Sequence, residues 1–218
     1  MQTLEYVTKK FNLDPNIYSG RMPIEIPNYG RKQLADLFRE LDFKVGVEVG
    51  VAAGEYSEIL CEANPQAMIY AIDPWGYYRE YRDYTRKETF NRLYEDAYKR
   101  LAHRANCQMV QKTSMEALKD FKDDSVDFVY IDANHRFEFV ANDIAGWSRK
   151  LKHGGIISGH DYIRAKSKDG MGNYTHVFEC VNAYTDAYRI KPWFILGTNA
   201  ILPGEIRDRC RSWMWVKP

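Results

Sequence analysis

Apolar residues alternate at the start of the central part of the chain, where valines stand at every second position over 45–49. β-branched residues with a period of two are typical of a strand. Gly50 and Gly54 follow, and an apolar pattern of helical period then runs over 56–63. The pattern predicts a strand, a tight turn and a helix, in which the glycines let the backbone approach a ligand closely.

Strand and helix patterns continue to alternate along the rest of the chain. Helical periods recur over 34–41, 90–101, 114–121, 137–147 and 177–184. Further strands are expected at 68–72, 107–111, 126–131 and 156–158. Five strand–helix units predict an α/β fold with a mostly parallel, doubly wound sheet. Three late apolar runs, 193–196, 200–202 and 213–216, have no helix between them, so we expect antiparallel pairing at the sheet edge.

A chain of 218 residues is long enough for one α/β domain and too short for two. Residues 1–30 are rich in Asn, Pro, Tyr and Gly and show no sustained period. We expect them to form an irregular arm, with a short helical piece at most, that covers a site as a lid. Residues 31–218 are then expected to form a single domain.

Composition limits the classes of partner and the compartment that we expect. Thirty-one basic and thirty acidic residues leave a net charge of +1, which disfavours nucleic acid or an anionic membrane as a partner. The four cysteines are widely spaced, as expected of reduced thiols. No apolar run reaches the ~18 residues of a membrane span, and the start lacks a signal-peptide pattern, so we expect a cytoplasmic protein. Assembly into a homo-oligomer is left open.

The glycine turn favours a nucleoside without phosphates. A dinucleotide fingerprint needs G-x-G-x-x-G, but Ala52 and Glu55 stand where the second and third glycines would be. Carboxylates at Glu55 and Glu48 would repel a phosphate at the helix N-terminus. Asp73 ends a second strand about 20 residues on, where such sites hold a ribose. S-adenosylmethionine fits this pattern because its far end carries an ammonium and a sulfonium.

These motifs resemble a known family. Its elements here are Glu48-x-Gly50-x-x-x-Gly54, Asp73, Ile131-Asp132-Ala133-Asn134-His135 and Gly154-Gly155-Ile156-Ile157-Ser158-Gly159-His160-Asp161-Tyr162. In this order they resemble a class I S-adenosylmethionine-dependent methyltransferase, most closely the methyltransferase 24 group, which is similar to macrolide sugar O-methyltransferases and cephalosporin-hydroxylase-type proteins. The resemblance covers about 45–162, roughly half of the chain, and implies a Rossmann-like sheet of seven strands.

Residues that follow the predicted strands are the candidates for cofactor binding, because ligands of open α/β sheets lie beyond the carboxyl ends of the strands. We expect Glu48 to bind the methionine ammonium, Asp73 the ribose, Trp75 or Pro74 the adenine face, and Thr113 or Ser114 the adenine edge. The full predicted set is Glu48, Gly50, Gly54, Tyr56, Ser57, Asp73, Trp75, Thr113, Ser114 and Asp132. The structural alternative makes Glu48 a helix N-terminal charge and Asp73 a turn former before Pro74.

A second group combines Asp132, His160 and Asp161 as a predicted metal site. Two carboxylates beside a histidine suit Mn²⁺, Fe²⁺ or Zn²⁺ and still allow Mg²⁺. In related sugar O-methyltransferases a metal lies on acids at these two strand ends, and the resemblance places Asp132 and Asp161 there, whereas His160 departs from the usual acid. The alternative is that Asp132 orients a loop and His160 pairs with Asp161.

Methyl transfer to a hydroxyl needs a group that takes the proton. The predicted catalytic set is His135, His160 and Asp132, with His135 favoured as the base because imidazole titrates near neutral pH. The tyrosine-rich segment 77–87 is a candidate substrate lid, and 164–174 is expected to be a loop that closes over the acceptor.

The leading hypothesis is an O-methyltransferase acting on a sugar or phenolic hydroxyl of a small molecule. A nucleic-acid methyltransferase is the nearest rival, but no Asn/Asp-Pro-Pro-aromatic motif or Pro-Cys nucleophile is present. A dehydrogenase is disfavoured by the glycine spacing. A protein that binds the cofactor without transferring a methyl group stays open, because fold does not fix function.

Overall fold

The structure is a computed structural model that describes residues 2–13, 22–78, 86–164, 175–200 and 203–218. Its strands are β1 (Ile24–Ile26), β2 (Val45–Val49), β3 (Met68–Ile72), β4 (Cys107–Val110), β5 (Val126–Ile131), β6 (Leu151–Gly159), β7 (Phe194–Leu196) and β8 (Trp213–Val216). Its helices are α1 (Thr3–Lys10), α2 (Arg31–Glu40), α3 (Glu55–Ala63), α4 (Lys87–Leu101), α5 (Ser114–Ala117), the 3-10 turn η2 (Leu118–Asp120), α6 (Phe137–Lys150) and α7 (Val177–Ala187).

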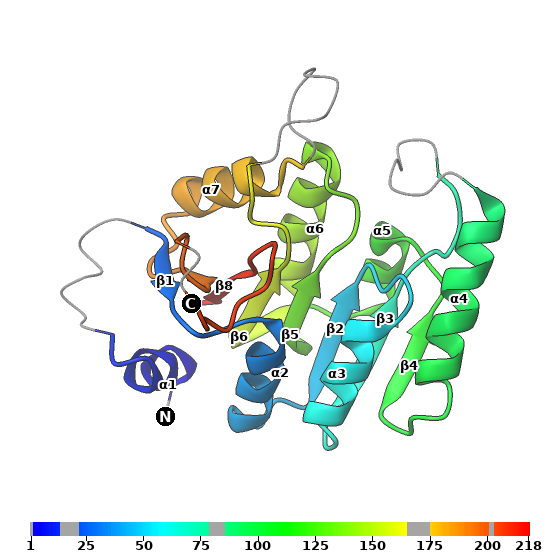
Figure 1. The fold of residues 1–218 in the computed structure, drawn as a ribbon, viewed down its shortest axis with the longest axis horizontal. Coiled ribbons are helices and arrows are strands. Elements are labelled where there is room, and N and C mark those ends of the chain that lie inside the picture. The colour runs from blue at the N-terminus through cyan, green and yellow to red at the C-terminus, as the bar shows by residue number, and fades with distance from the viewer. Residues whose placement is uncertain (1, 14–21, 79–85, 165–174, 201–202) are drawn as a thin grey trace.

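One sheet of eight strands runs through the described part of the chain, in the order β1-β7-β8-β6-β5-β2-β3-β4. Strands β2 to β6 pair in parallel, and β8 runs antiparallel to both β6 and β7. The expected α/β, mostly parallel, Rossmann-like fold with antiparallel pairing in its C-terminal part is therefore confirmed (Figure 1).

Two details differ from the expectation. β8 lies between β6 and β7, so the antiparallel pair is not itself the edge of the sheet. An eighth strand, β1, comes from the N-terminal region expected to be irregular, and it pairs in parallel with β7. Three residues are too few to show a period of two, which is why the sequence pattern missed this strand. The expected strand at 200–202 includes residues outside the described part.

Helices cover both faces of the sheet. α1, α2, α3 and α4 pack on one face, and α5, α6 and α7 on the other, as the ribbon in Figure 1 shows. Strand residues alternate between the faces, so Val47 and Val49 contact the α6 side while Gly46 and Glu48 face α3. A Cβ at Gly46 would stand 2.0 Å from the Phe128 ring, so only glycine admits this aromatic packing.

The parallel strands bring their carboxyl ends to one edge of the sheet. The turns that follow β2, β3, β4, β5 and β6 therefore lie side by side, and most of the predicted site residues stand in them. α1 packs near the start of β6, where Thr3 approaches Gly154, and its lid role stays a prediction. Among the described residues, no helix combines the length and apolar character needed to cross a membrane.

Candidate functional site

Two adjoining cavities open at this edge of the sheet. The first, of about 250 Å³, lies between α6 and the turns after β3 and β4, and most of its lining is apolar; we call it the apolar cavity. The second, of about 520 Å³, lies between α2, α3 and the turns after β5 and β6, and we call it the polar cavity. Gly50, Ala52 and Asp132 line both, so the two cavities form one cleft.

Asp73 lines the apolar cavity and holds the glycine turn in place. Its Oδ2 accepts hydrogen bonds from the N–H groups of Val51 and Ala52 at 3.0 and 2.9 Å, and its Oδ1 accepts one from Trp75 at 2.7 Å. Burial raises the pKa of Asp73, and the three hydrogen bonds oppose that shift. A carboxylate offers about four lone-pair positions, so Asp73 keeps the capacity to accept one further donor from a ligand.

The residues predicted to contact adenine also line the apolar cavity. Trp75 is 5 % exposed and its Nε1 donates to the carbonyl of Ala52 at 2.8 Å, which fixes the indole ring. Thr113 caps α5 by accepting a hydrogen bond from the N–H of Glu116. Ser114 follows Thr113 in the lining. The structure thus brings these predicted residues together, each with a partner inside the protein.

Asp143 lines the apolar cavity and was not predicted. It lies on α6, is 3 % exposed, and accepts a hydrogen bond from the Ser114 hydroxyl. Burial raises the pKa of Asp143 to about 7, although the Ser114 hydrogen bond opposes the shift. The sequence did hold a signal, because Asp143 stands three residues after Val140 and four before Trp147, on the apolar face of the helix.

Glu48 is the buried acid of the polar cavity. It is 2 % exposed, and Ser57, on α3, donates a hydrogen bond to its carboxylate. Burial raises the pKa of Glu48 to about 8, and the Ser57 hydrogen bond opposes this rise. Ionised Glu48 is therefore costly unless a cation enters the cavity.

The two glycines of the turn are required by contacts inside the fold. Gly50 has φ +92°, and a Cβ there would stand 2.2 Å from the carbonyl oxygen of Asp132. Gly54 has φ +82°, and a Cβ there would stand 3.1 Å from the Cα of Ala97 on α4. We expected both glycines to permit a tight turn and close approach of a ligand. Their positive φ angles agree with the turn, the structure adds close approach of neighbouring backbone, and contact with a ligand stays a prediction.

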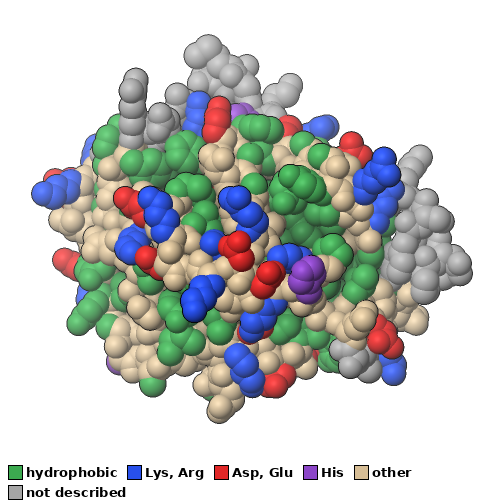
Figure 2. Space-filling model, turned by 180° about the vertical axis from the view of Figure 1, so that it is seen from behind, with side chains coloured by type: hydrophobic (Ala, Val, Ile, Leu, Met, Phe, Trp, Pro, Cys, Tyr) green, Lys and Arg blue, Asp and Glu red, His purple; other side chains and the backbone are tan. Residues whose placement is uncertain are grey.

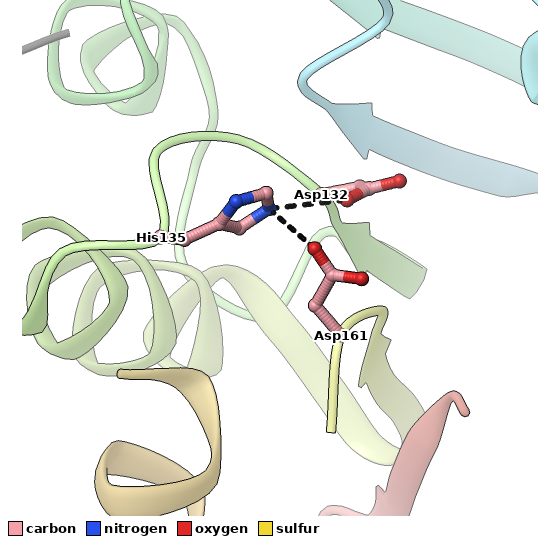
Figure 3. Close-up of side chains that lie close together, drawn as sticks. All are labelled: Asp132, His135 and Asp161. Carbon is pink, nitrogen blue, oxygen red and sulfur yellow. Dashed lines mark hydrogen bonds and ion pairs between the residues drawn. The ribbon is translucent and has the colours of Figure 1, made fainter. Parts of the chain in front are cut away.

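Asp132, His135 and Asp161 meet at the floor of the polar cavity, and Figure 3 shows the imidazole pointing toward both carboxylates. The His135 Nε2 lies 3.0 Å from Asp161 Oδ2 and 3.5 Å from Asp132 Oδ1. The three side chains are 17 to 23 % exposed. The turns after β5 and β6 therefore build an acid–histidine–acid group that a ligand can reach.

His160 lies behind this group. Its Nδ1 is 3.1 Å from Asp161 Oδ1 and 3.8 Å from Asp132 Oδ2. Burial alone would lower the pKa of His160, but the Asp161 hydrogen bond and the Asp132 charge raise it. Burial alone would raise the pKa of Asp161, but both histidines hold it below its usual value. The described lining of the two cavities does not include His160.

The acid–histidine group has the donor atoms of a divalent-metal site. One ligand atom each from Asp132, His135 and Asp161 lies within 4.8 Å of the others. The predicted set had His160 in place of His135, and the structure brings His135 into the cluster. Two carboxylates and an imidazole are donors that Mn²⁺, Fe²⁺ and Zn²⁺ accept, so the residues fit such a cation.

Arg31 is the second residue that the sequence analysis missed. It opens α2 and lines the polar cavity opposite the strand ends. Its carbonyl accepts a hydrogen bond from the hydroxyl of Tyr56, a predicted site residue that is 3 % exposed and lines the same cavity. Arg31 does not follow a strand, so the rule that ligands bind beyond the strand ends cannot predict it. It reaches the cavity because α2 packs on the sheet.

Proteins of known structure share this fold. A candidate caffeoyl-CoA O-methyltransferase from Staphylococcus aureus is 12 % identical, with a TM-score of 0.59 over 98 % of this chain and 91 % of that one. An O-methyltransferase from Bacillus cereus, solved in complex with SAH, is 14 % identical, with a TM-score of 0.58 over 99 % of this chain and 90 % of that one. At such identities the likeness shows the fold alone.

Sequence comparison extends the match to a family. An uncharacterized protein, y4gI, from Sinorhizobium fredii is 28 % identical over 127 residues, which are 53 % of this chain and only 13 % of that protein. The family described as "Methyltransferase domain" matches residues 47–162. That segment spans 116 of the 218 residues and includes Asp73 and Asp132 of the cleft, so the chain belongs to this methyltransferase-domain family, with the class I S-adenosylmethionine-dependent methyltransferase fold.

Proposed function

We propose that the chain binds S-adenosylmethionine along the cleft and transfers its methyl group to a hydroxyl of a small molecule. The adenosine lies in the apolar cavity, with a ribose hydroxyl on Asp73. The methionine end lies in the polar cavity, with its ammonium on Glu48. The sulfonium is then near Gly50 and Asp132, which line both cavities.

One observation carries the proposal: the cleft joins an apolar half to an acidic half. Glu48, Glu55, Asp132 and Asp161 all line the polar cavity, so it attracts a cation and repels a phosphate. S-adenosylmethionine has an uncharged nucleoside with an apolar adenine face at one end, and its ammonium and sulfonium lie toward the other end. The charge pattern of the cleft therefore matches this cofactor and opposes a dinucleotide.

The acid–histidine group suits removal of a proton from the acceptor. Methyl transfer from sulfur requires in-line attack by an oxygen, and the protein contributes by positioning that oxygen and taking its proton. A hydroxyl that enters between Asp132 and Asp161 meets the His135 Nε2. His160 is the weaker candidate for the base, because the described lining of the two cavities includes His135 and does not include His160. Asp132 and Asp161 orient the His135 ring.

The charge of the described surface and of the polar cavity favours a small acceptor over nucleic acid. Basic and acidic side chains are interspersed on the face shown in Figure 2, with no broad basic field among the described residues there. The acids of the polar cavity would repel a phosphate backbone. An uncharged or cationic sugar or phenol meets no such barrier.

The test begins with cofactor binding. We expect isothermal titration calorimetry to show binding of S-adenosylmethionine and S-adenosylhomocysteine and none of NAD. Replacing Asp73 by Ala should weaken S-adenosylhomocysteine at least tenfold, whereas Asp186→Asn, an exposed site on α7, should not. Heat from NAD without heat from S-adenosylhomocysteine would overturn the cofactor assignment.

Activity then distinguishes an enzyme from a cofactor-binding protein. A panel of sugars, phenols and short oligonucleotides is incubated with methyl-labelled cofactor, and the products are separated by mass spectrometry. Label on a hydroxyl oxygen, reduced at least tenfold by His135→Ala, supports the proposal. Label on the oligonucleotides alone would instead support the nucleic-acid alternative, and cofactor binding with no transfer to any acceptor would support the binding protein.

Binding of a divalent cation is a second candidate role of the acid–histidine group, favoured by the three ligand atoms that lie within 4.8 Å of one another. Asp132, Asp161 and a histidine would hold it, and it would lower the pKa of an acceptor hydroxyl. EDTA treatment followed by addition of Mg²⁺, Mn²⁺ or Zn²⁺ tests this role. Turnover that falls with EDTA and returns with one cation supports metal assistance, and unchanged turnover assigns proton removal to His135 alone.

A further inference from the structure

Arg31 stands out among the residues of the polar cavity because of its charge. Among the described residues that line this cavity it is the one lysine or arginine, and it faces a lining with four acids. Its side chain is 30 % exposed, so a ligand in the cavity can reach it. The proposed function assigns Glu48 to the cofactor ammonium but leaves Arg31 without a role.

Contacts with Tyr56 on α3 and with Asp208 hold Arg31 in this place. Its guanidinium carbon lies 5.4 Å from the centre of the Tyr56 ring, which the hydroxyl bond to the Arg31 carbonyl also fixes. The carboxylate of Asp208 accepts a hydrogen bond from the Arg31 N–H at 2.7 Å. Asp208 can come so close because the preceding residue, Gly30, has no side chain; a Cβ there would stand 3.2 Å from its Oδ2.

The guanidinium keeps hydrogen-bonding capacity for a ligand. Its ion pair with Asp208 joins Nε and Oδ1 at 4.0 Å, which is too long for a hydrogen bond. The head group has five N–H donors in a planar fork that matches the two oxygens of a carboxylate. A positioned arginine of this kind is suited to bind a carboxylate with two parallel hydrogen bonds.

We propose that Arg31 binds a carboxylate in the polar cavity, and that this is the carboxylate of the cofactor's own amino acid. The inference rests on the proposed function. The methionine end carries an ammonium and a carboxylate on the same carbon, and Glu48 and Arg31 line the same cavity with the opposite charges. A carboxylate on the acceptor is the other source of the same chemistry, and the experiment separates the two.

The experiment compares ligands with and without the amino acid. S-adenosylhomocysteine carries the ammonium and the carboxylate. Decarboxylated S-adenosylmethionine carries the ammonium and a sulfonium but no carboxylate, and 5′-methylthioadenosine lacks the whole amino acid. Affinities are measured by calorimetry on the full chain, on Arg31→Gln, on Arg31→Lys, and on the control Arg39→Gln at the far end of α2. Thermal unfolding of each variant checks that it folds.

We expect Arg31→Gln to weaken S-adenosylhomocysteine by tenfold to hundredfold, the usual loss for a charge-assisted pair of hydrogen bonds. Arg31→Lys should recover part of this loss. Both variants should bind decarboxylated S-adenosylmethionine and 5′-methylthioadenosine within about twofold of the original chain. Arg39→Gln should change none of the affinities.

Other results would assign the carboxylate to the acceptor or overturn the role of Arg31. If Arg31→Gln leaves every cofactor affinity unchanged but raises KM for acceptors that carry a carboxylate, and not for their amides, the carboxylate belongs to the acceptor. An equal loss of affinity for all three ligands would mean that Arg31 only supports the cavity wall, which overturns the inference. An Arg31→Gln variant with no change in any affinity or KM would overturn it as well. If the original chain binds no S-adenosylhomocysteine, the proposed function fails first.

Discussion

Two buried acids, one in each half of the cleft, show how a single residue acquires its chemistry from the fold. Glu48 and Asp143 are 2 and 3 % exposed, and burial raises the pKa of both. Each accepts a hydrogen bond from a serine in the first turn of a neighbouring helix, Glu48 from Ser57 and Asp143 from Ser114. A cationic or hydrogen-bond-donating ligand group would stabilise the ionised form of either acid.

Glu48 should make cofactor binding depend on pH. With a pKa of about 8 in the empty site, the Glu48 carboxyl is protonated below that pH, and binding of an ammonium must release the proton. Affinity for S-adenosylhomocysteine should therefore rise from pH 6 to 8, by up to about tenfold per pH unit. Calorimetry in buffers of different ionisation enthalpy should show proton release at pH 7.

Glu48→Gln should bind more weakly and lose this rise, because its amide does not titrate. Glu55→Gln is the matched control, since Glu55 is exposed and lines the same cavity. A slope between pH 6 and 8 that survives in Glu48→Gln would show that another group releases the proton.

Asp143 should make the stability of the fold depend on pH. Its pKa is about 7 in the folded chain against an ordinary value of 3.8 for an aspartate, so between about pH 4 and 7 the folded chain holds a proton that the unfolded chain has released. The free energy of unfolding should fall as pH rises through this window and level off above it. The expected loss, relative to Asp143→Asn, is on the order of 2–4 kcal/mol.

Urea unfolding at half-unit pH steps measures this difference. Asn keeps an oxygen that accepts the Ser114 hydrogen bond, so the comparison isolates the charge. Parallel profiles for the two proteins from pH 4 to 7 would mean that Asp143 ionises in the folded chain as easily as in the unfolded one.

At the scale of elements, the turn from β2 to α3 is shaped by backbone that packs against backbone. Gly50 meets the Asp132 carbonyl, and Asp73 accepts hydrogen bonds from the N–H groups of Val51 and Ala52. The turns after β2, β3 and β5 therefore fix one another. A cofactor lying along the cleft would touch a surface that these contacts have already formed.

Gly50→Ala tests how much this packing contributes. A left-handed alanine costs about 1–2 kcal/mol, and the overlap at 2.2 Å with the Asp132 carbonyl adds about 1–3 kcal/mol. Gly204→Ala is the matched control, because Gly204 has φ +78° and nothing within 4 Å of its added Cβ. Urea unfolding should show Gly50→Ala less stable than Gly204→Ala. Equal losses would mean that the neighbouring turn simply moves aside.

The sequence predicted elements whose period was long enough to see. β2, β3 and β5 carry five or six residues each, and α4 and α6 several turns, and all were expected near their observed bounds. β1, with three residues, and the start of β6 before its two glycines were not. The strand-end rule found Glu48, Asp73, Asp132 and Asp161 because topology alone places them.

Residues that reach the cleft from helices were harder to predict. Arg31 opens α2 and Asp143 lies in the second turn of the expected helix at 137–147, and both enter the cleft only because those helices pack on the sheet. His135 and His160 were both expected near Asp132. Which of the two lines the polar cavity beside Asp132 and Asp161 depends on the geometry of the turns after β5 and β6. Sequence spacing does not contain this information.

At the scale of the molecule, the C-terminal strand supports the site from behind. β8 inserts between β6 and β7, so residues near the end of the chain pair with the strand that leads to His160 and Asp161. The Trp213 Nε1 donates to the carbonyl of His160 at 3.1 Å, and its ring lies against Gly159. The position of the acid–histidine group thus depends on sheet assembly across the chain.

Trp213→Phe should disturb both stability and the site, whereas Trp215→Phe should disturb stability alone. Both rings are buried and stack at 5.0 Å on one face of β8, so each substitution opens a small cavity at a cost of about 1–2 kcal/mol. Trp213→Phe also leaves the His160 carbonyl without its donor, which adds about 1–3 kcal/mol. In urea unfolding Trp213→Phe should therefore be the less stable variant.

Turnover of an identified acceptor should fall in Trp213→Phe and stay within twofold in Trp215→Phe, because only the first variant releases the turn that carries Asp161. Equal turnover in the two variants would show that β8 stabilises the sheet without positioning the acid–histidine group.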